Sequence, residues 1–209
     1  MNTNKAELFR LRCNSSGAAA SGLAQRRSDN FSVRALMLFC AMLAGSGTAP
    51  AVGAELLVIG GEGDGVSVVG AGLRTREWKT WASGERWRLS LAPEWQIGIW
   101  DAQQPGISKT RIVDSSLTGV LTVRPREDVG SVYYLDIGFG VHMLSHTRIS
   151  EERNFGSSFQ FGELVGIGMD FGQRRPYSVA ARVQHVSNGG IKRPNPGVTF
   201  AQVLVVCRF

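Results

Sequence analysis

Cysteines are few in this sequence, and long apolar runs are missing. Of the 209 residues only three are cysteines, and Cys13 and Cys40 lie in an N-terminal segment that precedes the regularly patterned part of the chain. Cys207 then stands alone, which excludes an internal disulfide from the remainder. The most apolar run, Ala35 to Leu43, is much shorter than the about 20 residues of a membrane-spanning helix. The sequence therefore predicts neither a disulfide framework nor a helical membrane protein.

The N-terminal segment has the features of an export signal. Arginines precede the apolar run, and small residues follow it up to Val52-Gly53-Ala54. This succession of basic, apolar and small-residue regions is typical of a signal peptide. We therefore predict that residues 1–54 are an N-terminal extension and signal peptide, cleaved near Ala54, and that residues 55–209 form the functional domain.

Positive charge is in excess but is not concentrated. The formal net charge is +6, and part of it lies in the predicted leader, while the rest is scattered along the chain. A nucleic-acid-binding protein gathers its basic residues on one face or helix, so we predict no nucleic-acid partner. An anionic lipid headgroup suits this charge better.

After Ala54 the chain shows no helical period, and apolar residues alternate with small or polar ones. The segment from Ser158 to Gly172 is the clearest example. One of its faces is apolar and carries Phe159, Phe161, Val165, Ile167, Met169 and Phe171. The other carries Gln160, Gly162, Gly166, Gly168 and Asp170. Segments 131–144 and 87–100 repeat this pattern, which indicates an all-β chain.

About eight such segments follow one another, separated by Gly, Pro, Asn and Asp. Their second faces carry glycines and charges, and aromatic residues lie near the segment ends, as in a small transmembrane barrel with a polar interior. The alternation continues through Val203, Val205 and Cys207 to Phe209, and a terminal aromatic residue resembles the assembly signal of outer-membrane proteins. We predict an eight-stranded antiparallel transmembrane β-barrel of the outer membrane. A periplasmic β-sandwich with the same patterning is the alternative.

One segment places a candidate nucleophile and base on its apolar face. Within Tyr177 to Ser187, His185 and Ser187 share a face with valines and an alanine. Residues two apart on a strand stand side by side, and a serine becomes nucleophilic when a base accepts its proton. Thr199 lies on the apolar face of the last segment, where hairpin geometry makes it a neighbour of His185 and Ser187. The alternative is an interfacial histidine beside a turn-capping serine.

The run from His185 to Gly197, HVSNGGIKRPNPG, resembles the signature of the lipid A 3-O-deacylase (PagL) family. The resemblance is strongest from about Ser131 to Phe209, where segments 138–141, 161–163 and 166–168 also look like family segments. It implies an outer-membrane barrel with its active site on the outer wall. Such an enzyme hydrolyses the ester at position 3 of lipid A, the lipid of lipopolysaccharide, and releases a 3-hydroxy fatty acid.

The resemblance also implies roles for individual residues. Ser187 matches the family's nucleophile and His185 its general base, and Asn188 matches a residue that helps to stabilise the oxyanion. Support of the oxyanion and the site would be shared among Asn188, Gly189, Gly190 and Asn195.

The chain departs from the family at the triad acid. Members that carry this acid have a glutamate where Thr199 stands here, and threonine supplies no negative charge. Glu163 lies on the lipid-facing side of its segment and is our candidate acid, with the Thr199 hydroxyl as an alternative orienting group. Glu163 would otherwise be an interfacial carboxylate or a partner of Arg182 or Lys192. A slow dyad or an inactive protein completes the alternatives.

The remaining expectations concern ligands and partners. Lys192 and Arg193, with Arg153, would meet the phosphorylated headgroup of lipid A. No metal or other cofactor is expected, because His142 and His146 lack a second ligand at metal-binding spacing. We expect His142 in an interior polar network.

Residues 60–65, rich in glycine, are interpreted as a flexible entry to the first strand. A homodimer is left open. A non-catalytic structural or adhesion barrel and a soluble lipid-binding barrel, whose apolar faces would point inward, are the competing functional classes.

Overall fold

The computed structural model of the chain describes residues 53–75, 77–83, 85–103, 111–126, 132–149, 153–173 and 175–208. Their strands are β1 (Ala54–Gly63), β2 (Val66–Thr75), β3 (Lys79–Ser83), β4 (Trp87–Ala102), β5 (Ile112–Pro125), β6 (Tyr133–Leu144), β7 (Phe159–Phe171), β8 (Tyr177–Ser187) and β9 (Val198–Arg208). Almost all of the predicted leader, and Phe209, lie outside the described residues. Among the residues described, no helix is long and apolar enough to cross a membrane.

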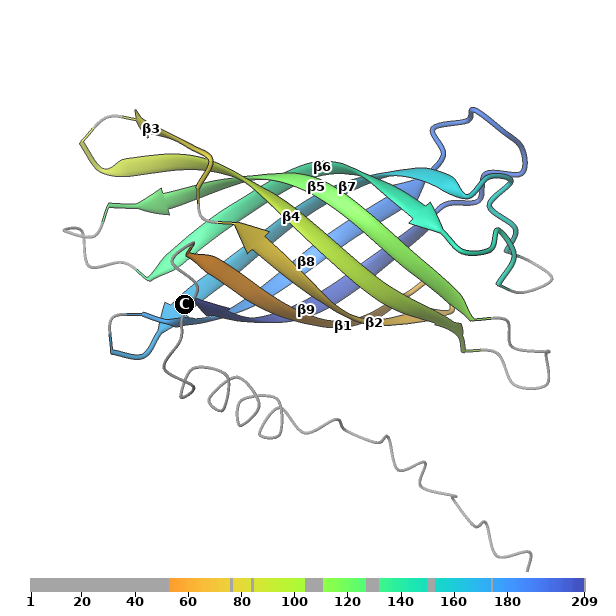
Figure 1. The fold of residues 1–209 in the computed structure, drawn as a ribbon, viewed down its shortest axis with the longest axis horizontal. Coiled ribbons are helices and arrows are strands. Elements are labelled where there is room, and N and C mark those ends of the chain that lie inside the picture. Colours follow the sequence, from red (N-terminus) through yellow and green to blue (C-terminus); the bar gives the residue numbers. More distant parts are fainter. Residues whose placement is uncertain are drawn as a thin grey trace, which may run out of the picture. The chain divides into compact units, whose positions relative to one another are not determined.

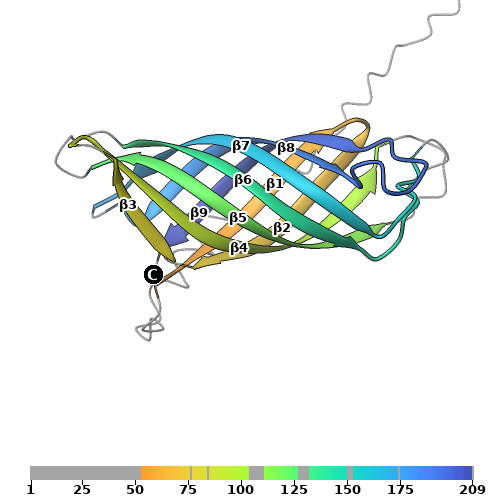
Figure 2. The same cartoon turned by 90° about the horizontal axis from the view of Figure 1, so that it is seen from above.

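The strands form one closed antiparallel barrel (Figure 1, Figure 2). Neighbours along the chain pair with each other from β4 to β9, β1 pairs with both β9 and β2, and β2 closes the circle on β4. The short β3 pairs with the same strand as β2, because Arg74 lies opposite Glu94 and Lys79 opposite Leu91 on β4. β2 and β3 thus occupy one position in the wall, which confirms the predicted eight-stranded barrel.

The barrel is apolar outside and polar inside. Large side chains on the outer face of β6 and β7 are exposed, among them Phe139 and Ile167, while their neighbours in sequence are buried. Alternation with an apolar outer wall is the pattern of a barrel surrounded by lipid. The soluble lipid-binding barrel is therefore wrong, because its apolar faces would point inward, and the β-sandwich is excluded by closure.

Buried charges fill the middle of the barrel. Glu94 of β4 is fully buried, and it accepts hydrogen bonds from Arg74 of β2 (Nε, 2.7 Å) and Arg182 of β8 (Nη1, 2.8 Å). Arg74 Nη2 also donates to Asp136 Oδ2 of β6 at 3.0 Å. Arg182 points inward, so it is not the partner of Glu163 that the sequence left open. This network joins four strands across the interior.

The two ends of the barrel differ. At the end that carries the longer connections, after β4, β6 and β8, an apolar cluster fills the interior, with Trp100 packed edge-on against Phe155 and Phe200. Near it, His142 Nδ1 lies 2.8 Å from Asp114 Oδ2, in the interior polar network that was expected. Longer loops of outer-membrane barrels face the cell exterior. We call the end with the longer connections the loop end. Its apolar cluster includes Val186 and Val198, the residues on either side of the loop after β8.

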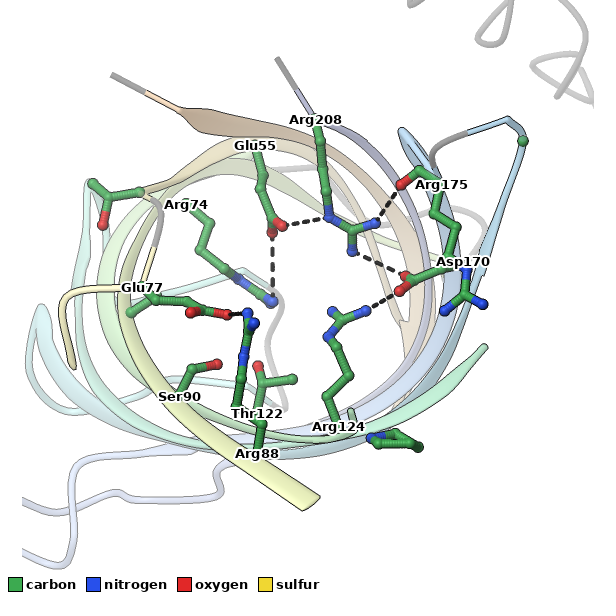
Figure 3. Close-up of a pocket in the computed structure, with 14 residues that line it drawn as sticks. Glu55, Arg74, Glu77, Arg88, Ser90, Thr122, Arg124, Asp170, Arg175 and Arg208 are labelled. Atoms are coloured by element: carbon green, nitrogen blue, oxygen red, sulfur yellow. Dashed lines mark hydrogen bonds and ion pairs between the residues drawn. The ribbon is translucent and has the colours of Figure 1, made fainter. Parts of the chain in front are cut away.

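The opposite end, where β1 begins and β9 ends, holds a cavity of about 890 Å³ (Figure 3). Its wall is charged, and Arg208 bridges Glu55 (2.7 Å) and Asp170 (3.0 Å) there. Arg124 pairs with the same Asp170. This charged cavity lies at one end of the barrel, and Ser187, the last residue of β8, lies at the other end (Figure 1).

Candidate active site

Three neighbouring strands meet at the candidate site on the outer wall. His185 of β8 lies opposite Glu163 of β7 and Thr199 of β9, and Ser187, the last residue of β8, lies opposite Phe161. His185 is exposed on the outer face, and Ser187 is half-buried. The period of two along β8 therefore brings the proposed base and nucleophile side by side at the loop end.

His185 contacts a hydroxyl group on the neighbouring strand β9. Its Nδ1 lies 2.9 Å from Thr199 Oγ1, within hydrogen-bond distance. When Nδ1 carries the proton, it donates to this hydroxyl oxygen and leaves the lone pair on Nε2. This is the tautomer that a general base requires.

Gly197 closes the site from the side of the loop. A Cβ atom at this position would lie 2.9 Å from Cε1 and 3.3 Å from Nε2 of His185, and 3.4 Å from Cβ of Ser187. The imidazole of His185 and the side chain of Ser187 therefore both lie close to Gly197. Its φ of 62° is also one that glycine tolerates best.

The hydroxyl of Ser187 makes no hydrogen bond to another residue of the described ranges. Catalytic hydrogen bonds are often long without substrate and tighten when it binds. His185 is nonetheless adjacent to Ser187, because it stands two residues earlier on β8 and both side chains lie close to Gly197.

Glu163 lies beside His185 but is not bonded to it. The carboxylate is exposed on the outer face of β7 and makes no hydrogen bond or ion pair within the described ranges. The Nδ1 atom of His185 is directed to the other neighbouring strand, toward Thr199. Of the two candidate orienting groups, the structure thus brings Thr199 into contact and leaves Glu163 as a nearby charge.

Asn188 organises the loop that follows β8. Its side chain is fully buried, and Nδ2 donates to the carbonyls of Phe155 (2.9 Å) and Lys192 (2.7 Å), while Oδ1 accepts from Gly190 N (3.0 Å). Both amide hydrogens are used, so the side chain offers no donor to an oxyanion in this arrangement. Its backbone N–H donates to Asn195 Oδ1 (2.9 Å), which places both signature asparagines in one loop-stabilising network.

One backbone donor next to the serine remains available. Asn188 N and Gly190 N are bonded as described, and Ile191 N donates to Asn188 O at 3.2 Å. Gly189 N has no partner among the residues described. It lies two residues after Ser187 in the sequence.

The basic residues divide between the loop and the site. Lys192 and Arg193 are exposed in the loop after β8. Arg153, from the preceding long loop, donates from Nη1 to the carbonyl of Gly197 at 2.7 Å. Arg153 is thus hydrogen-bonded to Gly197, the residue that packs beside the candidate nucleophile.

The sequence did not point to Asp64. Its Oδ2 accepts a hydrogen bond from the backbone N–H of Thr199 at 2.8 Å. Residues 60–63 belong to β1, and Asp64 and Gly65 form the hairpin turn to β2 with φ values of 53° and 75°, so the flexible entry expected here is wrong. The available signal was the Asp-Gly pair between alternating segments, the usual sequence of a two-residue turn with positive φ.

Among the described residues, no group of three or more His, Cys, Asp or Glu side chains is arranged to hold a metal ion.

The fold and the site together define a small membrane β-barrel with a serine and a histidine on its lipid-facing wall. The sequence model of the family described as Lipid A 3-O-deacylase (PagL) matches residues 68–208. The chain belongs to this family, which confirms the resemblance and makes the protein an enzyme by family.

Two relatives share the description Lipid A deacylase PagL. The protein of Bordetella bronchiseptica is 31% identical over 135 residues, which cover 63% of this chain and 70% of that protein. The protein of Pseudomonas aeruginosa is 38% identical over 65 residues, or 31% of this chain and 36% of the relative. A crystal structure of the outer membrane enzyme PagL has a TM-score of 0.62 at 24% identity and covers 73% of this chain and 98% of that one. At that identity the likeness is one of fold.

Proposed function

We propose that this protein is an outer-membrane esterase that hydrolyses the 3-O-linked acyl chain of lipid A, with Ser187 as nucleophile and His185 as general base. The observation that carries the proposal is the placement of this pair at the loop end of an apolar outer wall, in a chain of the deacylase family. A lipid in the outer leaflet reaches such a site by lateral diffusion. No passage through the barrel is needed.

The reaction follows from the arrangement of the side chains. His185 Nε2 takes the proton of Ser187 Oγ as this oxygen attacks the ester carbonyl. The N–H of Gly189 stabilises the oxyanion of the tetrahedral intermediate. His185 then gives the proton to the departing sugar oxygen, and an acyl-enzyme remains. Water, deprotonated by His185, releases the 3-hydroxy fatty acid and restores the serine.

The surrounding residues position these groups. Asn188 and Asn195 hold the loop so that Gly189 stays beside Ser187. Thr199 keeps the imidazole in the useful tautomer. Lys192, Arg193 and Arg153 form a basic rim beside the site, suited to the phosphates of the lipid A headgroup. The protein acts in the outer membrane after export and cleavage of its leader near Ala54.

Mass spectrometry of lipid A incubated with the detergent-purified protein tests the proposal. We expect the loss of one 3-hydroxy-acyl chain with the wild type and no loss with Ser187→Ala. Glu163→Gln tests the candidate acid, since the rate of fatty-acid release falls in this variant only if the Glu163 carboxylate assists His185. Unchanged lipid A with a correctly folded wild type would instead support a non-catalytic barrel.

Gly197→Ala should lower kcat about 100-fold, because the added methyl group crowds both His185 and Ser187, and small misplacements of reacting groups have effects of this size. Gly190→Ala is the matched control: its φ of 81° makes it strained in the same way, but nothing lies within 4 Å of the added atom. Rates of fatty-acid release from lipid A give the comparison. An equal loss in both variants would show that loop strain, and not crowding of the pair, is responsible.

A further inference from the structure

The carboxylate of Asp64, in the turn between β1 and β2, contacts the backbone of the neighbouring strand β9 next to the proposed active site. Asp64 Oδ2 accepts the backbone N–H of Thr199 at 2.8 Å, and Thr199 Oγ1 lies 2.9 Å from His185 Nδ1. One residue of β9 therefore connects a carboxylate to the imidazole. This carboxylate comes from a position unrelated to that of the family glutamate.

The turn between β1 and β2 is fixed in this place by backbone contacts. β1 pairs with β9 as far as Glu62 opposite Ala201, so the turn that follows lies against the beginning of β9. A Cβ atom at Gly63 would be 1.8 Å from the carbonyl oxygen of Thr199, which shows how closely the two backbones approach. Asp64 itself has a φ of 53°, which aspartate tolerates better than most residues.

Arg153 ties the same carboxylate to the other side of the site. Its Nη2 lies 3.9 Å from Asp64 Oδ1, while its Nη1 donates to the carbonyl of Gly197, which packs on His185. The charged groups around the imidazole are thus Glu163 from β7, Asp64 from the β1–β2 turn and Arg153 from the loop after β6. Of the two carboxylates, only Asp64 is linked by hydrogen bonds, through Thr199, to Nδ1.

We propose that Asp64 is a positioning residue that supplies, through Thr199, the negative charge that the family glutamate would place beside His185. The inference rests on the proposed Ser187–His185 mechanism. Asp64 fixes the backbone of Thr199 so that the hydroxyl stays on Nδ1, and its charge favours the imidazolium that forms when Ser187 loses its proton. Because the carboxylate does not touch the imidazole and its side chain is 45% exposed, its effect is smaller than that of a direct triad acid.

Asp64→Asn tests the charge while keeping an oxygen that accepts the Thr199 N–H. We expect kcat for acyl release to fall about three- to tenfold, in keeping with one partly screened charge, with KM nearly unchanged. The acid limb of the pH–activity profile should also change, which a purely structural role of Asp64 would not produce. Asp101→Asn removes another loop-end carboxylate, paired with Arg111, and should leave rate and profile unchanged.

A rescue separates charge from structure. Thr199→Glu places a carboxylate directly beside Nδ1, so it should restore the rate in the Asp64→Asn background and make the enzyme insensitive to Asp64→Asn. Wild-type rate and pH profile in Asp64→Asn alone would overturn the inference. So would an equal loss from Asp64→Asn with and without Thr199→Glu. Release that does not depend on Ser187 in the same assay would refute the proposed function itself, whereas Ser187-dependent release insensitive to Asp64 refutes only this inference.

Discussion

Replacing Ser187 or His185 by alanine should each lower kcat on the order of 10⁴-fold or more, and replacing both should cost no more than either alone. In the proposed mechanism the two side chains act as one unit, because the histidine has no proton to take without the serine, and the serine hydroxyl is a poor nucleophile without the base. The slow residual reaction would come from lipid A binding and the Gly189 N–H. Initial rates of fatty-acid release are measured under one detergent condition for the wild type, the two single variants and the double variant. Together they form a double-mutant cycle.

His146→Ala is the control for loss of a histidine at this end of the barrel. His146 is exposed in the loop after β6, where its Nδ1 contacts only the Ser145 hydroxyl (3.0 Å) among the contacts of the described residues. It should retain wild-type activity. Additive losses in Ser187→Ala and His185→Ala would mean that the two residues act in separate steps, contrary to the proposed mechanism.

Local patterning was enough to predict the wall of the barrel and the placement of His185 and Ser187 on its outer face. The period of two placed His185 and Ser187 on the apolar face of β8, and the hairpin to β9 placed Thr199 beside His185, where the structure has it. These relations depend on residues close in sequence, and a single hairpin register determines them.

Contacts that depend on closure of the barrel were beyond such patterns. Asp64 and Thr199 are 135 residues apart and meet because β1 pairs with β9. Shear also decides which inward-facing charges meet. Glu94 and Arg182 are 88 residues apart, so the alternation within single segments did not identify them as partners. The use of both Asn188 amide hydrogens in the loop was likewise invisible, since one acceptor belongs to Phe155 in another loop.

Glu94→Gln should lower the free energy of unfolding of the barrel by about 3–5 kcal/mol. Glu94 lies in the barrel interior, away from Ser187 on the outer wall. Glu94 is fully buried and is the common acceptor of Arg74 and Arg182, whose side chains are nearly as well buried. Glutamine has nearly the same shape but no charge, and its amide group turns N–H donors toward guanidinium donors. The buried guanidinium groups of Arg74 and Arg182 then share fewer acceptors. The cost of removing these cations from water is no longer offset by the negative charge of the carboxylate.

Urea unfolding of the purified barrel in detergent, followed by tryptophan fluorescence and by heat-modifiable gel mobility, gives the free energy of unfolding. Glu77→Gln is the matched control, because it removes the same charge from a more exposed pair with Arg88 and should change stability by at most about 1 kcal/mol. Equal midpoints for the two variants would mean that water reaches the interior network and screens it. A selective loss in Glu94→Gln would show that buried ion pairs hold β2, β4, β6 and β8 together, and β8 is the strand that carries His185 and Ser187.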